Sequence, residues 1–412
     1  MGTNETEIDR IATEYVRLML VAGQYDEDLV DAYYGPDSLK PTEKQTTTAP
    51  YGLFAREATK LLSDLEQIPE SNAPDLSPSR QRHLHAQLVA LQTRMQILAG
   101  EKLTFDEESK LIYDVIVPQY NDNHFDSIVT RLDSLVPGEG ELFSRWKAFG
   151  DRFRVPCDKV ERVLKAAIEE ARRRTLVHYD LPEGERFDLE LVHDVSWGAY
   201  NWYQGDCHSL IQYNADSPMR IIDAVGLAAH EGYPGHHVAG IIQDSILYRQ
   251  NGWIEFSIVP LFSPTSLFSE GLANYGVELV FPREERIKFE AETHCPIAGI
   301  DSTGLPLYWE LRDLFKGLGS IWLVASRNYL DQNWTKEQTV AWLSKYTEPS
   351  PDRIERGLQF TEQYRAYRVT YTIGEQMVRE FMNRKAPGDH EKQWKLFWDL
   401  CANPVVPSDL NR

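Results

Sequence analysis

The chain has 412 residues, of which 42% are hydrophobic and 11% aromatic, a composition typical of a globular protein with a substantial core. Its formal net charge of −20 argues against nucleic acid and anionic membranes as partners, because both select basic surfaces. The four cysteines lie far apart without a Cys-x-x-Cys pair, which indicates neither a disulfide framework nor a cysteine zinc site.

The N-terminal half predicts a series of helices. Apolar residues recur at three-to-four spacing near residues 4–24, 53–67, 80–100, 106–117, 140–154 and 157–177. The N-terminus lacks the basic and apolar blocks of a secretory signal, and no stretch is suited to span a membrane. We therefore expect a cytoplasmic protein with a helical region over residues 1–185 and a second region over 186–412, together one compact unit.

Residues 186–214 have a different pattern, which predicts a small sheet. Residues 187–192 alternate between apolar and polar, and 209–214 have the character of a short strand. The fold class is therefore mainly α with a small β part (α+β). An exposed sheet edge can bind an extended peptide through main-chain hydrogen bonds, so Tyr213 and Asn214 on the second strand are candidate substrate-binding residues. The alternative is a purely structural hairpin.

The next segment combines residue types that suit a catalytic zinc site: His230-Glu231-Gly232-Tyr233-Pro234-Gly235-His236-His237. Zinc hydrolases bind the metal through neutral imidazoles and a carboxylate, leave one position open for water, and use a second carboxylate as general base. The common His-Glu-x-x-His motif places its histidines one helical turn apart. In this chain the second histidine comes six or seven residues after the first.

This longer spacing requires a break in the helix. In an unbroken helix, His230 would lie roughly 9 to 10 Å along the axis from either later histidine, too far to share one ion. Pro234 and Gly235 predict a bulge or kink between them. If two residues are looped out, Gly235-His236 corresponds to the Gly-His that ends many metallopeptidase motifs. His236 is then the expected ligand, with His237 in reserve.

A third ligand is expected from the segment Phe268-Ser269-Glu270-Gly271-Leu272-Ala273-Asn274-Tyr275, whose apolar residues have helical spacing. The Pro264-Thr265-Ser266 start signal would place Glu270 in the first turn of that helix. Asn274 follows one turn later, where its side-chain carbonyl could accept the free ring N–H of His230 and fix that ring's orientation.

With these two segments, the chain resembles the bacterial domain-of-unknown-function 885 family of gluzincin-type metallopeptidases. The resemblance covers about residues 200 to 375 and implies a mostly helical fold, one zinc ion per chain and hydrolysis of peptides. Many members carry Pro-Gly-Gln-Ala before a Tyr-x-x-Gly near the C-terminus. This chain retains Tyr371-Thr372-Ile373-Gly374 but lacks the Pro-Gly-Gln.

The expected chemistry is Glu-assisted attack of a zinc-bound water on a carbonyl, with Zn²⁺ held by His230, His236 and Glu270 and with Glu231 as general base. Tyr371 and Arg368 are candidate donors to the oxyanion, and Tyr367 is a candidate substrate contact. The expected substrates are short peptides. The alternatives are a zinc hydrolase of a non-peptide amide or ester, and a non-catalytic metal-binding or interaction protein in which His237 closes the site as a fourth ligand. The sequence has no clear signature of oligomeric state.

Overall fold

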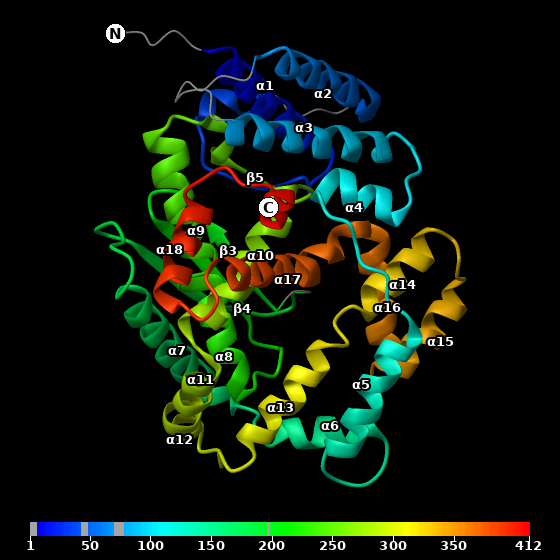
Figure 1. Ribbon diagram of the computed structural model, residues 1–412, viewed down its shortest axis with the longest axis vertical. Coiled ribbons are helices and arrows are strands. Elements are labelled where there is room, and N and C mark those ends of the chain that lie inside the picture. Colours follow the sequence, from blue (N-terminus) through cyan, green and yellow to red (C-terminus); the bar gives the residue numbers. More distant parts are fainter. Residues whose placement is uncertain (1–5, 43–47, 70–77, 196–197, 349) are drawn as a thin grey trace.

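Helices dominate the computed structural model (Figure 1), which describes residues 6–42, 48–69, 78–195, 198–348 and 350–412. Those of the N-terminal half are α1 (Glu7–Ala22), α2 (Tyr51–Glu66), α3 (Pro78–Leu98), α4 (Phe105–Tyr113), α5 (Asp122–Leu135), α6 (Leu142–Asp151) and α7 (Val160–Thr175). Those that follow are α8 (Ile221–Leu227), α9 (His236–Ile242), α10 (Pro264–Val280), α11 (Arg283–Phe289), α12 (Cys295–Ala298), α13 (Leu305–Lys316), α14 (Ile321–Leu330), α15 (Lys336–Tyr346), α16 (Pro351–Tyr364), α17 (Val369–Lys385) and α18 (His390–Cys401). The mainly helical fold class with a small sheet is confirmed.

The six predicted helices of the N-terminal half are all present, with ends that differ by a few residues. Helix α5 was not predicted. Its apolar residues Phe125, Ile128, Val129, Leu132 and Leu135 have helical spacing and pack in the core, so the sequence contained this signal. Polar side chains fix several helix starts: Thr6 and Thr104 each form a reciprocal capping box at the beginning of α1 and α4.

The strands form two small sheets. Strand β1 (Val30–Tyr33) pairs antiparallel with β5 (Ile258–Pro260). Strands β2 (Arg186–Val192), β3 (Ala199–Tyr203) and β4 (His208–Asn214) form the second sheet in the order β2-β4-β3. The predicted small sheet is therefore present, but the prediction that residues 209–214 form its edge is wrong. Strand β3, which the sequence did not reveal, pairs with β4 and leaves it in the centre.

Two hydrophobic cores lie on either side of helices α10 and α17. One core joins α1–α4 to Leu267 of α10 and Ile373 of α17. The other joins α5–α7 to the later helices, and it includes Phe268 of α10 and Val378 of α17. The first 185 residues therefore contribute to both cores, because α5–α7 pack with the second half of the chain (Figure 1).

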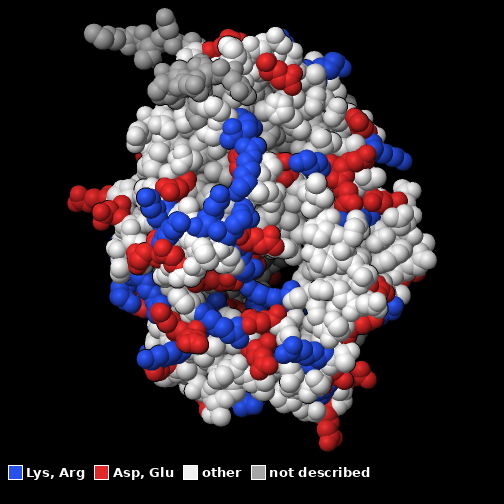
Figure 2. All heavy atoms as spheres, viewed as in Figure 1, with Lys and Arg blue, Asp and Glu red and all other residues white. Residues whose placement is uncertain are grey.

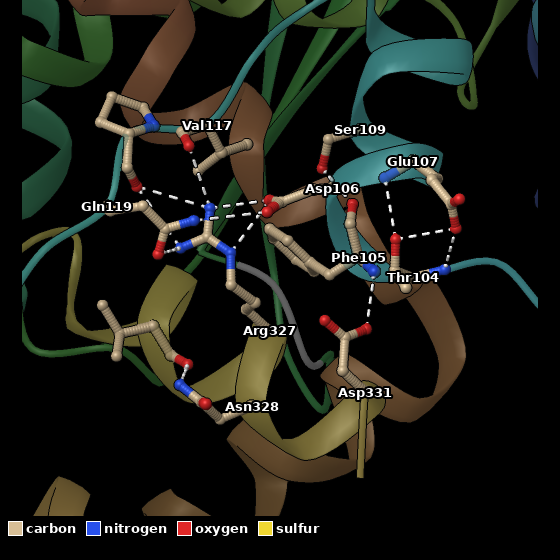
Figure 3. A network of polar contacts seen from close by, with 12 residues as sticks. Thr104, Phe105, Asp106, Glu107, Ser109, Val117, Gln119, Arg327, Asn328 and Asp331 are labelled. Atoms are coloured by element: carbon tan, nitrogen blue, oxygen red, sulfur yellow. Dashed lines mark hydrogen bonds and ion pairs between the residues drawn. The ribbon is translucent and has the colours of Figure 1, made fainter. Parts of the chain in front are cut away.

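A polar network ties α4 to the neighbouring helix α14 (Figure 3). Arg327 donates from Nε and Nη2 to Asp106 Oδ1 at 2.9 and 2.8 Å, and from Nη2 to the carbonyl oxygen of Val117 at 3.0 Å. One turn later, Asp331 Oδ1 accepts the backbone N–H of Phe105 at 2.7 Å. These bonds anchor the start of α4 to a helix more than 200 residues away in sequence.

Within the described residues, no helix combines the length and the apolar character needed to cross a bilayer.

Candidate metal centre

The helix that carries His230 widens before it ends. Helix α8 continues into one π-helical turn, η4 (Ala228–Gly232), and the chain then turns sharply through a cis Tyr233-Pro234 peptide bond. The backbone N–H of Gly235 returns to the carbonyl oxygen of Ala229 at 2.9 Å, and α9 begins at the next residue. The break expected from Pro234 and Gly235 is present. It shortens the distance in space between His230 and His236.

The break brings His230 and His236 face to edge, with ring centroids 4.7 Å apart and the planes at 89°. Both rings direct Nε2 at Glu270, whose Oε2 lies 3.6 Å from His230 and whose Oε1 lies 3.4 Å from His236. Glu270 comes from the second turn of α10 rather than the expected first turn. The helix starts at Pro264, where Ser263 Oγ accepts the N–H of Ser266.

These three side chains could hold a metal ion, and their donor atoms are of the types that zinc binds. Their ligand atoms all lie within 4.8 Å of one another, and all three side chains are half-buried. Tetrahedral zinc with bonds of about 2.1 Å places its ligand atoms about 3.4 Å apart, close to the two contacts with Glu270. Two imidazoles and one carboxylate also leave a fourth position open, as catalytic zinc sites do.

Glu231 lies beside this cluster without belonging to it. Its Oε1 is 4.0 Å from His230 Nε2, and it is not among the three residues that could hold a metal. The strand β3 fixes its backbone, because Asn201 Nδ2 donates to the carbonyl oxygen of Glu231 at 2.6 Å. Asn201 has no signal in the sequence that links it to the motif.

The reserve ligand His237 faces away from the cluster. It is fully buried, with Nδ1 at 2.8 Å from Ser209 Oγ and Nε2 at 3.5 Å from Glu185 Oε1. Its ring also packs edge-on against Phe187 and Tyr233. Successive residues of a helix point about 100° apart, so His236 and His237 serve different sides of α9.

The expected hydrogen bond between Asn274 and the ring of His230 is not formed. Asn274 Nδ2 donates to the carbonyl oxygen of Glu270 at 2.9 Å, so its amide folds back onto its own helix and makes no hydrogen bond to His230. Ser269 instead contacts one of the two rings, with Oγ at 3.1 Å from His236 Nδ1. That contact leaves Nε2 of His236 directed at Glu270. Ser269 adjoins Glu270 in the sequence motif, so the motif itself contained this signal.

The cluster has a strongly negative surrounding. Burial lowers the pKa of His236, but the hydrogen bond and charge of Glu270, together with Glu231 and Asp31, outweigh it and raise that pKa to about 9. Burial raises the pKa of Glu270, and the two histidines reverse this so that its pKa is lowered overall. Three carboxylates around two imidazoles favour a cation at this point.

Asp31 is a member of this surrounding that the sequence did not reveal. It lies on β1, about 200 residues before the motif, and accepts a hydrogen bond from the hydroxyl of Tyr200 on β3. Burial and the charge of Glu270 raise the pKa of Asp31 to about 6, against the opposing effect of His236.

Helix α17 meets α10 with no space between the backbones. A Cβ atom on Gly271 would lie 2.5 Å from the carbonyl oxygen of Gly374, and one on Gly374 would lie 2.3 Å from that of Leu267. The glycines of the Ser-Glu-Gly and Tyr-x-x-Gly motifs therefore touch. The contact holds Glu270 and Tyr371 at adjoining positions on the two helices. Burial and the charge of Glu270 raise the pKa of Tyr371, so its hydroxyl remains a donor near neutral pH.

The other two candidate residues of this segment are held by protein contacts, and Tyr367 packs edge-on against Tyr371 itself. Tyr367 is buried and packs edge-on against Tyr113, so it is not exposed as a substrate contact. Arg368 donates from Nη2 to the carbonyl oxygen of Gly357 at 2.8 Å and stacks on Trp322, with 4.4 Å from its guanidinium carbon to the ring centroid. Its guanidinium therefore braces α16. Tyr371, in contrast, exposes 46% of its surface, although protein atoms surround its hydroxyl group.

The predicted substrate contacts Tyr213 and Asn214 are also buried. The hydroxyl of Tyr213 donates to the carbonyl oxygen of Ser217 at 2.9 Å, and Asn214 Nδ2 donates to that of Val195 at 3.0 Å. Both side chains stabilise the end of the central strand β4. They do not form a peptide-binding edge, because β4 has a partner on either side.

A cavity of about 680 Å³ adjoins the cluster. His230 and Glu231 line it together with residues from α8, α10, α11, α13 and α17. Figure 2, which has the same view as Figure 1, shows a hollow near the middle of the molecule, with basic and acidic side chains around its rim. Cavities of this size suit a small ligand or a few residues of a peptide.

The fold is similar to that of known structures. The chain is similar to "the putative lipoprotein from Colwellia psychrerythraea", with a TM-score of 0.56 and 14% identity. The match covers 87% of this chain and 65% of that protein, so the chain spans about two thirds of its length. No family model and no curated protein matches the chain. The likeness therefore concerns the fold alone.

Proposed function

We propose that this protein is a zinc-dependent metallopeptidase that cleaves short peptides. One observation carries the proposal: the ligand atoms of His230, His236 and Glu270 converge within 4.8 Å, with Glu231 beside them and a cavity next to both. The sequence resemblance to the domain-of-unknown-function 885 family agrees with this proposal. So does the position of His237, since a residue bound to Ser209 is not a fourth ligand that would close the site.

A bound zinc ion would supply a water of lowered pKa and an electrophile for the substrate carbonyl. Glu231 is the general base: its carboxylate accepts the proton of the attacking water and later passes it to the leaving amine. Asn201 keeps the Glu231 backbone in place, and Ser269 orients His236. Tyr371 donates its O–H to the oxyanion of the tetrahedral intermediate.

Strand β3 is the proposed substrate-binding edge in place of β4. Among the described strands it pairs on one side only, and its first residue, Ala199, lines the cavity. An extended peptide could add to this edge through main-chain hydrogen bonds. A cytoplasmic location stays a prediction from the sequence.

The test combines metal analysis with digestion of a mixed peptide library. We expect about one zinc per chain and cleavage that is read by mass spectrometry. Glu231→Gln should retain zinc and lower turnover at least about a hundredfold, because general-base catalysis contributes that much or more. Glu284→Gln, an exposed glutamate on α11, is the matched control and should leave turnover unchanged.

Two results would reject the proposal. One is a purified protein that binds no metal at His230, His236 and Glu270. The other is a Glu231→Gln variant that hydrolyses every substrate as fast as the parent protein. Cleavage of simple esters or non-peptide amides with no cleavage of peptides would instead assign the alternative hydrolase function.

A further inference from the structure

The cavity beside the candidate metal centre contrasts with the acidic character of the whole chain. Its lining includes five basic and five acidic residues, besides His230: Arg283, Arg286, Arg312, Lys316, Arg379, Asp223, Glu231, Glu278, Asp313 and Glu375. The formal net charge of the protein is −20, yet the cavity gathers as many cations as anions. Which of these cations already have partners decides what the cavity can bind.

Three of the basic residues are neutralised within the lining. Arg283 pairs with Asp313. Arg379 pairs with both Glu278 and Glu375. Lys316 shares the same two glutamates, at 3.6 Å from Glu278 and 3.1 Å from Glu375. These groups balance one another and leave no cation in excess.

Arg312 on α13 is the exception. Its closest carboxylate is Asp223 Oδ1, at 4.0 Å from Nη2, the limit of an ion pair. The other oxygen of Asp223 is occupied by the backbone N–H of Arg220 at 2.9 Å. The Arg312 side chain is 44% exposed, and no hydrogen bond to it is found among the described residues. A substrate anion could therefore use all of its N–H donors.

A second guanidinium, that of Arg286, lies near Arg312 but is already paired with a carboxylate. Arg286 is held on the cavity wall by Glu290 Oε1 at 2.9 Å and by the carbonyl oxygen of Ile222 at 2.6 Å. Burial lowers the pKa of Arg286, Glu290 raises it, and the positive charge of Arg312 lowers it further. The two guanidiniums repel each other across this end of the cavity, which an incoming anion would relieve.

The cavity lining also includes apolar side chains. The Arg286 guanidinium stacks over Trp309 at 4.4 Å from the ring centroid, and Phe281 and Val277 also line the cavity. An apolar side chain of a peptide would find aromatic and aliphatic surface here, while a charged group would reach Arg312.

The helix that carries His230 also gives an estimate of the distance between His230 and Arg312. Asp223, the neighbour of Arg312, precedes His230 by seven residues on the continuous helix of α8 and η4. Seven residues of helix rise about 10 Å. An extended peptide covers that distance with about three residues. A carboxylate at Arg312 would thus lie two or three residues from a carbonyl at the metal centre.

We propose that Arg312 binds a substrate carboxylate two or three residues beyond the scissile bond, so that the protein removes short C-terminal fragments from peptides. This inference rests on the proposed peptidase function. The free C-terminus of a peptide is the expected source of the carboxylate, and a glutamate side chain at the same position would offer the same chemistry. The neutralised arginines of the cavity give no such preference.

The experiment measures binding without turnover. Zinc-loaded Glu231→Gln protein is titrated calorimetrically with N-acetyl-Ala-Ala-Phe-Ala, with its C-terminal amide, and with the amide of N-acetyl-Ala-Ala-Phe-Glu. The free acid should bind about tenfold or more tightly than the amide, since a hydrogen-bonded charge is worth that much. Adding Arg312→Gln should abolish the difference, whereas adding Arg283→Gln should preserve it because Asp313 already neutralises that arginine. If the glutamate peptide alone regains tight binding, the side chain is the source.

Equal binding of the acid and both amides, or an unchanged preference in the Arg312→Gln protein, would overturn the inference. A library digest with the Glu231-containing protein tests the proposed function separately. Cleavage with no carboxylate preference in binding would leave the peptidase standing and remove the role of Arg312. A carboxylate preference with no cleavage of any peptide would do the reverse.

Discussion

Gly235 and His230 pack backbone against backbone: a Cβ atom on Gly235 would lie 1.8 Å from the carbonyl oxygen of His230 and 2.4 Å from that of Ala229. The sharp turn between the two histidines has room for glycine alone. This contact is the physical reason that a motif with the wrong helical spacing can still present both rings to Glu270.

Gly235→Ala should therefore damage both the fold and the metal site. Forcing a methyl group against fixed carbonyls should lower the free energy of unfolding by about 3 kcal/mol and displace His236, which weakens zinc binding at least about tenfold. Urea denaturation and competition with a zinc chelator measure the two effects. Gly52→Ala is the control, since a Cβ there meets only Arg56 Nη1 at 3.9 Å. A Gly235→Ala protein as stable and as zinc-binding as the parent would contradict the packing.

Substitutions of the neighbouring residues His236 and His237 should have different effects on metal binding and on stability. His236→Gln removes one of the three ligands and should weaken zinc binding beyond the roughly 10- to 100-fold that loss of a supporting hydrogen bond causes. His237→Gln should retain about one zinc per chain and lose about 1 to 3 kcal/mol of stability, because Ser209 and Glu185 lose a buried partner. Metal content and urea denaturation are measured on both. The opposite result, in which His237→Gln loses zinc and His236→Gln retains it, would assign His237 as the ligand.

Tyr371 and Arg368 should respond differently. Tyr371→Phe should lower kcat about 100- to 1,000-fold with zinc retained, since it removes one donor to the oxyanion. Arg368→Gln should mainly lower stability, by about 1 to 3 kcal/mol, because its guanidinium bonds to Gly357 and stacks on Trp322. Steady-state kinetics and denaturation distinguish the two. A larger loss of kcat in Arg368→Gln than in Tyr371→Phe would make the arginine the donor instead.

Glu185 should make the stability of the protein sensitive to acid. Burial raises its pKa, but the nearby His237 and the hydrogen bonds from Arg172 and Tyr233 outweigh this and lower it from 4.5 to about 2. The stabilisation is therefore complete above about pH 4.5 and is lost as the pH falls toward 2. The shift corresponds to roughly 3 kcal/mol.

Glu185→Gln should remove this contribution at neutral pH, so that the two proteins converge in stability as the pH is lowered. Urea denaturation from about pH 7 to about pH 3 measures the difference. Glu183→Gln, an exposed glutamate two residues earlier, should follow the profile of the parent protein. A difference between parent and Glu185→Gln that is constant with pH would show that the carboxylate is not responsible.

Local residue patterns were enough to predict much of this molecule. Helical periodicity located six helices of the N-terminal half, because apolar residues recur three to four positions apart along each of them. Pro234 and Gly235 predicted the break, since their backbone preferences act within a few residues. The choice of His236 and Glu270 followed from motif spacing, and the structure places both beside His230.

Relationships across the chain required the tertiary structure. The pairing of β3 with β4 buried Tyr213 and Asn214, and strand order depends on contacts that no single segment encodes. Asp31 and Asn201 reach the site from other elements, and Arg312 stands out only because its neighbours pair with one another. The sequence by itself determined the residue types and the local break of the candidate metal site. Packing of distant elements decided which side chains face the site, because burial and pairing depend on neighbours in space.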